Sequence, residues 1–179
     1  MKKNKGFSLA EAVVSSAILL LVASSVMAAS VMLRDVCRAS IAAHELQRSA
    51  SIIVGYVIQH GPGETAYNGL RSAVEYNTDG YPAGGGINFK GLDNVWRKYY
   101  VRDNTIIYES PTISSPSGRR AVYTAPPGVE IYLSFSSASE IIQAVSVTID
   151  LSQTIRGKRV SGNIVTWVNL MNVNSVTAT

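Results

Sequence analysis

The sequence predicts an α+β protein in which one long N-terminal α-helix packs on an antiparallel β-sheet head. An uncharged run extends from Ala12 to Leu33, and an apolar stripe with helical spacing follows it. The chain contains no proline before Pro62. From Ile87 onward, segments rich in β-branched and aromatic residues are separated by turn residues, which is typical of short antiparallel strands.

The N-terminal segment begins with a short basic leader. The leader contains three lysines and ends at Gly6, and a single carboxylate, Glu11, occupies the fifth position after that glycine. The next 22 residues, Ala12–Leu33, include no Lys, Arg, Asp, Glu or His. At about 1.5 Å per residue, a helix of this length spans roughly 33 Å, which is enough to cross the hydrocarbon core of a bilayer.

Glu11 is the residue that an ordinary membrane helix does not explain. A carboxylate at the head of a lipid-embedded helix is costly and usually marks a function. It needs a cationic partner that offsets the cost of burying its charge. Cleavage of the chain after Gly6 would create a new N-terminal amine, which would supply that partner.

These residues resemble the type IV prepilin signature. In this resemblance Gly6 is the last residue of the leader, Phe7 is the new N-terminus and Glu11 is the glutamate of the motif. The resemblance implies a prepilin peptidase that cleaves after Gly6 and methylates the new amine. It also implies that Glu11 pairs with the N-terminal amine of a neighbouring pilin or pseudopilin subunit during assembly on an inner-membrane platform.

The expected organisation follows from this resemblance. Residues 1–6 are the leader peptide, 7–33 the transmembrane and filament-core helix, 34–60 an amphipathic helix that packs on the head, and 61–179 the β-rich head. The leader lysines favour a cytoplasmic N-terminus, so the chain spans the bacterial inner membrane once with its head exported. The apolar helix lies in membrane lipid before the subunit enters an extracellular pilus or a periplasmic pseudopilus.

Two other interpretations of the N-terminus remain open. The first is an ordinary secretory signal peptide with a small-residue cleavage site at Val26-Met27-Ala28. The second is a signal anchor that stays uncut, with Glu11 extending toward the lipid headgroups. Both interpretations leave Glu11 without a purpose.

The apolar stripe predicts that the helix continues to about Gln59 and packs on a sheet. The residues of the stripe recur at spacings of three and four: Val36, Ala39, Ala43, Leu46, Ala50, Ile53 and Val57. Gly61-Pro62-Gly63 then ends the helix. Residues 61–86 are predicted as a loop, because seven of them are glycine.

Five strands are predicted after this loop: Val95–Val101, Thr105–Glu109, Glu130–Phe135, Ala144–Leu151 and Ile164–Met171. Turn residues at Arg102–Asn104 predict a hairpin between the first two. Polar loops are predicted at Pro111–Pro127 and Ser152–Asn163. Trp96 and Trp167 lie in apolar strand segments, which predicts that both are core residues.

The C-terminal half is similar to the later part of large minor pilins and of the J-type pseudopilins of type II secretion. The hairpin from Arg97 to Glu109 and the segment Thr166–Asn172 carry this resemblance. The chain departs from that pattern at Asn104, where glycine is common, and at Met171, where arginine is usual.

The charge composition gives little indication of a nucleic-acid partner. The formal net charge is +4, from 16 basic and 12 acidic residues, and removing the three leader lysines leaves 13 against 12, or +1. Basic clusters occur at Arg119-Arg120 and at Arg156–Arg159, both in predicted loops. Charges in loops are usually solvated, so DNA contact is not expected.

No catalytic residue, cofactor site or metal site is predicted. His44 and His60 are 16 residues apart on the predicted helix. Their separation of about 24 Å is too large for a shared metal or nucleophile. Asp93, Asp103 and Asp150 lack the dense spacing of a calcium loop and are interpreted as turn or surface residues.

The sequence therefore predicts a structural subunit of a type IV pilus or a type II secretion-like filament, a minor pilin or pseudopilin that acts in filament initiation and assembly. Many major pilins close a C-terminal loop with a disulfide, but this chain has one cysteine, Cys37, so a major pilin is the less favoured alternative. Cys37 is interpreted as a small apolar helix residue, with a bridge to another subunit as the alternative. A secreted or membrane-anchored binding domain, such as an adhesin with an ordinary signal peptide, is the alternative from another class.

Overall fold

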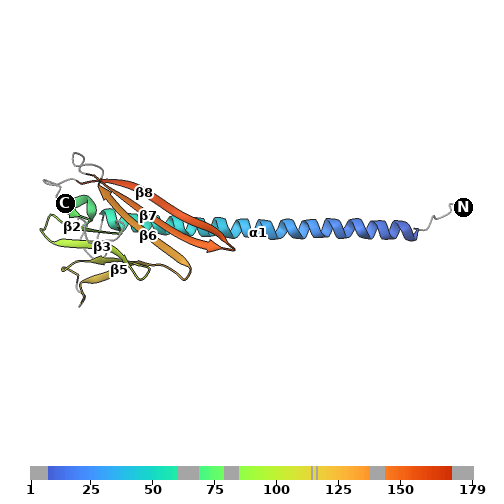
Figure 1. The fold of residues 1–179 in the computed structure, drawn as a ribbon, viewed down its shortest axis with the longest axis horizontal. Helices are drawn as coiled ribbons and strands as arrows, with labels where there is room; N and C mark the ends of the chain where they lie inside the picture. Colours follow the sequence, from blue (N-terminus) through green and yellow to red (C-terminus); the bar gives the residue numbers. More distant parts are fainter. Residues whose placement is uncertain are drawn as a thin grey trace. The chain divides into compact units, whose positions relative to one another are not determined.

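The computed structural model describes residues 8–59, 69–78, 85–113, 115, 117–137 and 144–170. Figure 1 shows the helices and strands in chain order. They are α1 (Leu9–Gln59), the 3-10 helix η1 (Leu70–Ser72), β1 (Glu75–Asn77), β2 (Gly86–Lys90), β3 (Trp96–Arg102), β4 (Thr105–Glu109), β5 (Arg119–Thr124), β6 (Val129–Ser137), β7 (Ala144–Ile155) and β8 (Lys158–Asn169). The chain divides into two compact units, Met1–Ile41 and Ala42–Thr179.

The α+β class is confirmed, with two sheets in place of the single predicted one. One sheet has five strands in the order β1-β2-β3-β4-β5, and the other has three in the order β6-β7-β8. Every paired strand is antiparallel to its neighbour, and neighbours in each sheet are consecutive along the chain. Strand β6 also lies against β2 and β3, so the two sheets share one core.

Two tight turns build the hairpins. Asp103 and Asn104 have φ values of 50° and 55°, which is the type I′ geometry that matches the twist of the flanking strands. The predicted β3–β4 hairpin is thus confirmed. Arg156 and Gly157, with φ values of 48° and 77°, form the same kind of turn between β7 and β8. The prediction of a polar loop at Ser152–Asn163 is therefore wrong, because β7 and β8 continue up to this two-residue turn.

Two other predicted loops also contain regular structure. Strand β5 lies within the predicted loop Pro111–Pro127 and pairs with β4. The described part of residues 61–86 contains η1, β1 and the first residue of β2. These short strands form because a neighbouring strand supplies their backbone hydrogen bonds, and local composition does not reveal such a partner.

The C-terminal part of α1 packs on the sheets of the second unit. Its buried residues are Leu46, Ala50, Ile53 and Val57, the last four of the predicted stripe. Ala39 and Ala43 are half-buried, whereas Val36 is 66% exposed. Val36 belongs to the first unit, in which no described residue is buried. The Tyr99 hydroxyl on β3 donates a hydrogen bond to the Tyr56 carbonyl oxygen at 3.1 Å, which fixes α1 to the five-stranded sheet.

Arg97 is the largest fully buried side chain of the described residues. Its guanidinium binds the Asp93 carboxylate at 2.6 and 2.8 Å and donates to the Val95 carbonyl oxygen at 3.0 Å. Asp93 lies in the turn between β2 and β3, as predicted, and its side chain is 40% exposed. Hydrogen bonds from Arg97 hold the pKa of the Asp93 carboxyl below its usual value, although burial acts in the opposite direction.

We expect Asp93→Asn to lower the free energy of unfolding by about 3 kcal/mol, because it removes the carboxylate charge that the buried Arg97 guanidinium binds. Asp103→Asn is the matched control. Asp103 is 90% exposed and pairs with Arg102 at 3.4 Å on the surface, so this change should cost at most about 0.5 kcal/mol. Urea denaturation of the full chain measures both, and equal midpoints for Asp93→Asn and the wild type would contradict the role given to this pair.

The same pair predicts an acid dependence of stability. Because folding depresses the pKa of Asp93, its stabilising contribution is complete above the unfolded value of about 3.9 and disappears as pH falls through the folded pKa. The wild type should therefore lose stability below about pH 4 more steeply than Asp93→Asn. Parallel pH profiles of the two proteins would exclude Asp93 as a source of this dependence.

Candidate functional site

The N-terminus of α1 contains a reciprocal pair of hydrogen bonds between Ser8 and Glu11. The Ser8 backbone amide donates to Glu11 Oε2 at 3.0 Å, and the Glu11 amide donates to Ser8 Oγ at 3.2 Å. This is a capping box, in which two amides that lack helical partners are satisfied by side chains. Gly6 and Phe7, the other two predicted site residues, lie outside the described residues.

The capping box gives Glu11 a local role that the sequence analysis missed. The pattern Ser-x-x-Glu ahead of an apolar run is the signal by which it could have been found. A carboxylate in the first turn also interacts favourably with the positive end of the helix dipole. The box uses only Oε2 of the carboxylate, so a cationic partner at Glu11 does not require that the cap be broken.

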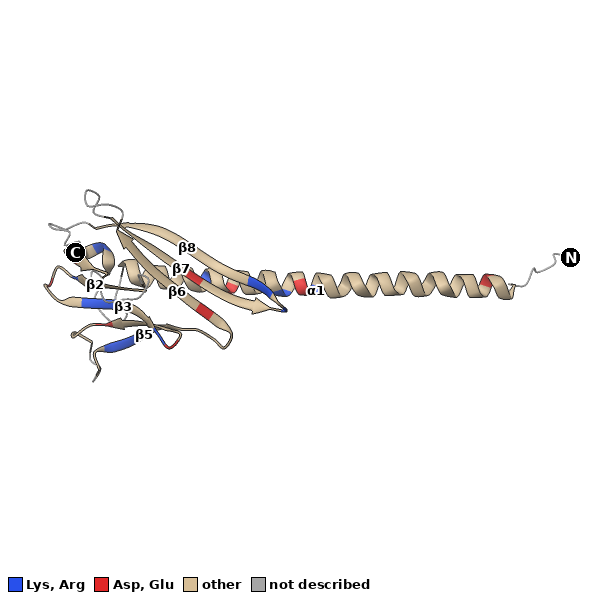
Figure 2. Cartoon of the chain, viewed as in Figure 1, with Lys and Arg blue, Asp and Glu red and all other residues tan. Residues whose placement is uncertain are grey.

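The apolar run that follows Glu11 has no buried residue in its own unit. Its large hydrophobic side chains are about half to nearly three-quarters exposed, as at Val31 with 49% and Met32 with 73%. By length and composition α1 is long and apolar enough to cross a membrane. Figure 2 shows the same segment as tan ribbon beyond the acidic residue of the first turn. An uncovered apolar surface of this extent requires lipid or other protein around it.

Four of the five serine hydroxyls in this run are satisfied within the helix. These four donate to backbone carbonyl oxygens three or four residues earlier, at 2.8–2.9 Å: Ser16 to Val13, Ser24 to Leu21, Ser25 to Val22 and Ser30 to Val26. Polar groups in hydrocarbon must be paired internally, because no water is present to bind them. The serines are therefore compatible with a lipid or filament-core environment.

The second unit carries a compact charge network on the outer face of the five-stranded sheet. Glu109 on β4 accepts hydrogen bonds from Arg119 Nε at 2.9 Å and from the Tyr100 hydroxyl at 3.0 Å, and Lys98 Nζ lies 3.7 Å from it. Burial tends to raise the pKa of Glu109, but these donors outweigh it and hold the pKa below its usual value. Burial and the bond to Glu109 raise the pKa of Tyr100. Glu109 thus stays ionised and fixes three side chains.

The two basic clusters lie on strands and a turn. Arg119 and Arg120 begin β5, where a loop was predicted, and Arg119 is paired with Glu109. Arg156–Arg159 surrounds the β7–β8 turn, and Arg159 lies 3.5 Å from Asp150. Both clusters therefore contain a charge that is already compensated.

The prediction that both tryptophans are core residues is wrong. Trp96 is 46% exposed and Trp167 is 59% exposed. On β3 the inward positions belong to Arg97 and Tyr99, which are fully buried, so Trp96 points outward. On β8 Val168 is the buried neighbour, and Trp167 again takes the outer face.

The remaining candidate residues stay apart. Among the described residues, no three His, Cys, Asp or Glu side chains are grouped closely enough to hold a metal ion. His44 lies on α1, and His60 falls outside the described residues. Cys37 is exposed on α1 and makes no disulfide in the described part of the chain.

Residues 1–27 match the family model described as "Prokaryotic N-terminal methylation motif". The match includes the glycine, the aromatic residue and the glutamate of the predicted processing segment. Comparisons with curated proteins and with solved structures found no match. The motif implies processing by a prepilin peptidase and assembly with pilin subunits, and it supports a type IV pilin-like protein.

Proposed function

We propose that this chain is a processed membrane subunit of a type IV pilus or a type II secretion-like filament, a minor pilin or pseudopilin that acts in filament initiation and assembly. The observation that carries the proposal is the methylation motif at residues 1–27, which is in register with a helix apolar enough to span a membrane. The capped start of α1 at Ser8 agrees with a helix that begins beside the new N-terminus.

The proposed maturation has two steps. A prepilin peptidase cleaves the peptide bond after Gly6 and releases residues 1–6, and the same enzyme methylates the amine of Phe7. The mature chain loses three lysines and retains a net charge of +1.

Glu11 is the proposed assembly residue. Its carboxylate pairs with the N-terminal amine of a neighbouring subunit, and each charge offsets the burial cost of the other in an apolar helix bundle. The capping box assists by holding the carboxylate at the first turn of α1, because a side chain already fixed by a hydrogen bond loses less entropy when it pairs.

The proposed mechanism is a transfer of one helix between two environments. Residues 7–33 first lie in the bacterial inner membrane, with the head of residues 61–179 exported. The same apolar surface then packs among other subunits, delivered by an inner-membrane assembly platform. Residues 34–60 hold the head, which agrees with the burial of Leu46, Ala50, Ile53 and Val57. An extracellular pilus or a periplasmic pseudopilus is the final location.

We expect the membrane-extracted protein to begin at N-methylated Phe7, which intact-mass and N-terminal peptide mass spectrometry will show. The reason is that the leader, the glycine and the glutamate are in the register that the methylation motif requires. The control is Gly6→Leu, whose bulky side chain should block cleavage and leave residues 1–6 attached. A chain that starts near Ala29 would overturn the proposal in favour of an ordinary signal peptide and an exported binding domain.

A further inference from the structure

A surface pocket of about 510 Å³ lies on the outer face of the five-stranded sheet. Its floor is formed by Trp96 and Lys98 of β3 and Glu109 of β4, and Ser110 and Pro111 continue from β4 along its wall. The volume falls within the range of small-molecule sites, about 300–1,000 Å³. The charge network around Glu109 therefore borders a site large enough for a ligand.

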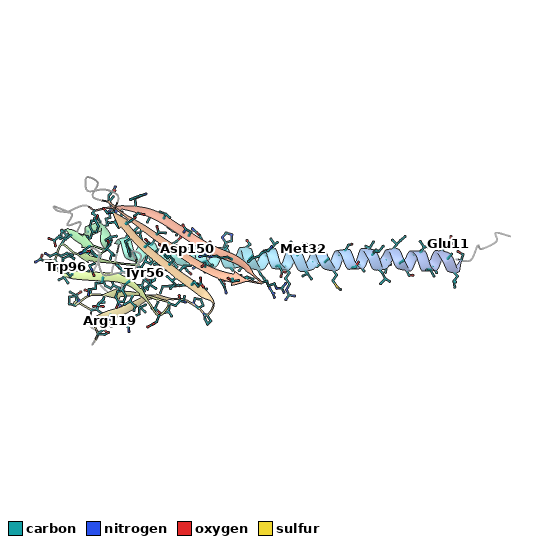
Figure 3. All side chains as sticks on the ribbon, viewed as in Figure 1. Glu11, Met32, Tyr56, Trp96, Arg119 and Asp150 are labelled. Atoms are coloured by element: carbon teal, nitrogen blue, oxygen red, sulfur yellow. The ribbon has the colours of Figure 1, made fainter. Side chains whose placement is uncertain are left out.

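Trp96 supplies the apolar surface of this pocket. Its indole is 46% exposed. On the β2 side, the strand register pairs Trp96 with Lys90. On the β4 side, Lys98 pairs with Glu109, so Trp96, two residues before Lys98, lies near Pro111, two residues after Glu109. Lys90 Nζ lies 6.0 Å from the ring centroid and is itself held by Glu75 at 3.6 Å. The ring is thus supported on its β2 side, and Figure 3 labels it among the side chains of the head.

The polar groups of the pocket balance in charge. Lys98 and Glu109 are the two charged residues that line it, and they lie 3.7 Å apart. They offer a donor and an acceptor while contributing no net charge. Within the lining, an anionic ligand would meet Glu109 and a cationic one Lys98, so the lining residues favour neither charge sign. Arg119 binds Glu109 from outside the lining.

The wall opposite the floor is held by its own backbone. The Ser110 amide donates to the Gly118 carbonyl oxygen at 2.8 Å, and the Gly118 amide donates to the Ser115 carbonyl oxygen at 2.9 Å. Ser110 is 1% exposed, and its hydroxyl lies 2.6 Å from that of Thr112. These bonds fix the described residues of the wall without a ligand, which lowers the cost of binding.

We propose that this pocket binds an uncharged saccharide. A sugar ring has one face of C–H groups, which stacks on an aromatic ring, and hydroxyls around its edge that bind paired donors and acceptors. Trp96 provides the stacking surface, and Lys98, Glu109, Ser115 and Ser117 provide the hydrogen bonds. This proposal does not depend on the filament function, because every residue that lines the pocket lies between positions 96 and 118, outside the methylation motif.

The test uses the full chain in a detergent without a sugar headgroup, since a glycoside detergent would compete. The Trp167→Phe variant leaves Trp96 as the sole tryptophan, so its fluorescence reports directly on the pocket. The probes are the neutral tetrasaccharides of glucose (α- and β-linked), galactose and N-acetylglucosamine. A tetramer of galacturonic acid and a deoxythymidine decamer are the charged probes.

We expect saturable quenching or a spectral shift with at least one neutral tetrasaccharide, and no comparable response to either charged probe. Binding of the same sugar, measured by calorimetry, should weaken about tenfold in Trp96→Ala. Trp167→Ala is the matched control, since it removes the other exposed tryptophan, on β8, and should leave the affinity unchanged.

Lys98→Gln is a second variant that retains the indole and should also weaken binding, so the test stands even if Trp96→Ala folds poorly. Three results would overturn the proposal. The first is no saturable binding of any neutral probe up to about 10 mM, which is well above the dissociation constant of a weak specific site. The second is equal affinity in Trp96→Ala and the wild type. The third is tighter, salt-dependent binding of a charged probe.

Discussion

Replacing Glu11 with glutamine should exclude the chain from filaments while leaving its N-terminal processing intact. In the proposed assembly, Glu11 neutralises the amine of a neighbouring subunit within an apolar bundle. Removing one member of a buried ion pair leaves an uncompensated charge and costs about 3–5 kcal/mol. A factor of ten corresponds to about 1.4 kcal/mol, so incorporation should fall by at least about a hundredfold. This expectation rests on the proposed function.

Glutamine is the informative substitution because it separates the two roles of Glu11. Glutamine also closes a capping box, so Glu11→Gln keeps the hydrogen bond from the Ser8 amide and removes only the charge. Ser8→Ala is the reciprocal control. It removes the hydroxyl that caps the Glu11 amide, at a cost of about 1 kcal/mol to the helix terminus, and it keeps the carboxylate.

The measurement is the ratio of subunit in sheared filaments to subunit in membranes, together with mass spectrometry of the N-terminus. We expect Ser8→Ala to be incorporated close to the wild-type level and Glu11→Gln to remain in the membrane as a processed, methylated chain. Equal incorporation of Glu11→Gln and the wild type would remove the assembly role of the charge. A defect in Ser8→Ala that matches Glu11→Gln would instead assign the effect to the helix cap.

Helix α1 could be predicted from the sequence almost to the residue. Its signals are local: an apolar run without proline, then a stripe at helical spacing, then Gly61-Pro62-Gly63. The β3–β4 hairpin was equally accessible, because Asp103 and Asn104 are residues that tolerate the left-handed conformation of its turn. Features encoded by neighbouring residues were therefore recovered.

Features that depend on distant partners were not recovered. The sequence around Trp96 predicted an indole in the core, whereas the structure leaves Trp96 exposed and buries its neighbour Arg97. Arg97 is buried because Asp93 and the Val95 carbonyl oxygen compensate its charge and donors. The pocket beside Trp96 escaped prediction for the same reason, since Glu109 joins it through strand pairing.

The N-terminal half of β8 was predicted as part of a loop, and one glycine explains why. In this half the inward positions alternate with exposed polar ones, as a half-buried strand requires. One inward position, however, is Gly162 where a large apolar residue would be expected. The reason is spatial: a Cβ atom there would lie within 3 Å of the α1 backbone at Leu46 and Gln47. The glycine erases the alternating pattern because the helix passes so close to the strand.

Gly162→Ala should accordingly be the most destabilising single-methyl substitution on this strand. The clashing atoms belong to the α1 backbone, so no flexible side chain can move aside, and the helix must separate from β8. Overpacking of this kind costs about 3 kcal/mol, which corresponds to a fall in melting temperature of roughly 10 °C for a unit of this size.

Gly55→Ala on α1 is the matched control, because a Cβ atom there meets nothing within 4 Å. Alanine in a helix interior is favoured over glycine, so this variant should be more stable than the wild type by about 0.8 kcal/mol. Thermal unfolding followed by circular dichroism compares the two. A Gly162→Ala protein as stable as the wild type would show that α1 and β8 do not approach so closely in solution. Opposite shifts in the two variants, by contrast, would establish that the same methyl group is harmful only where helix and strand backbones meet.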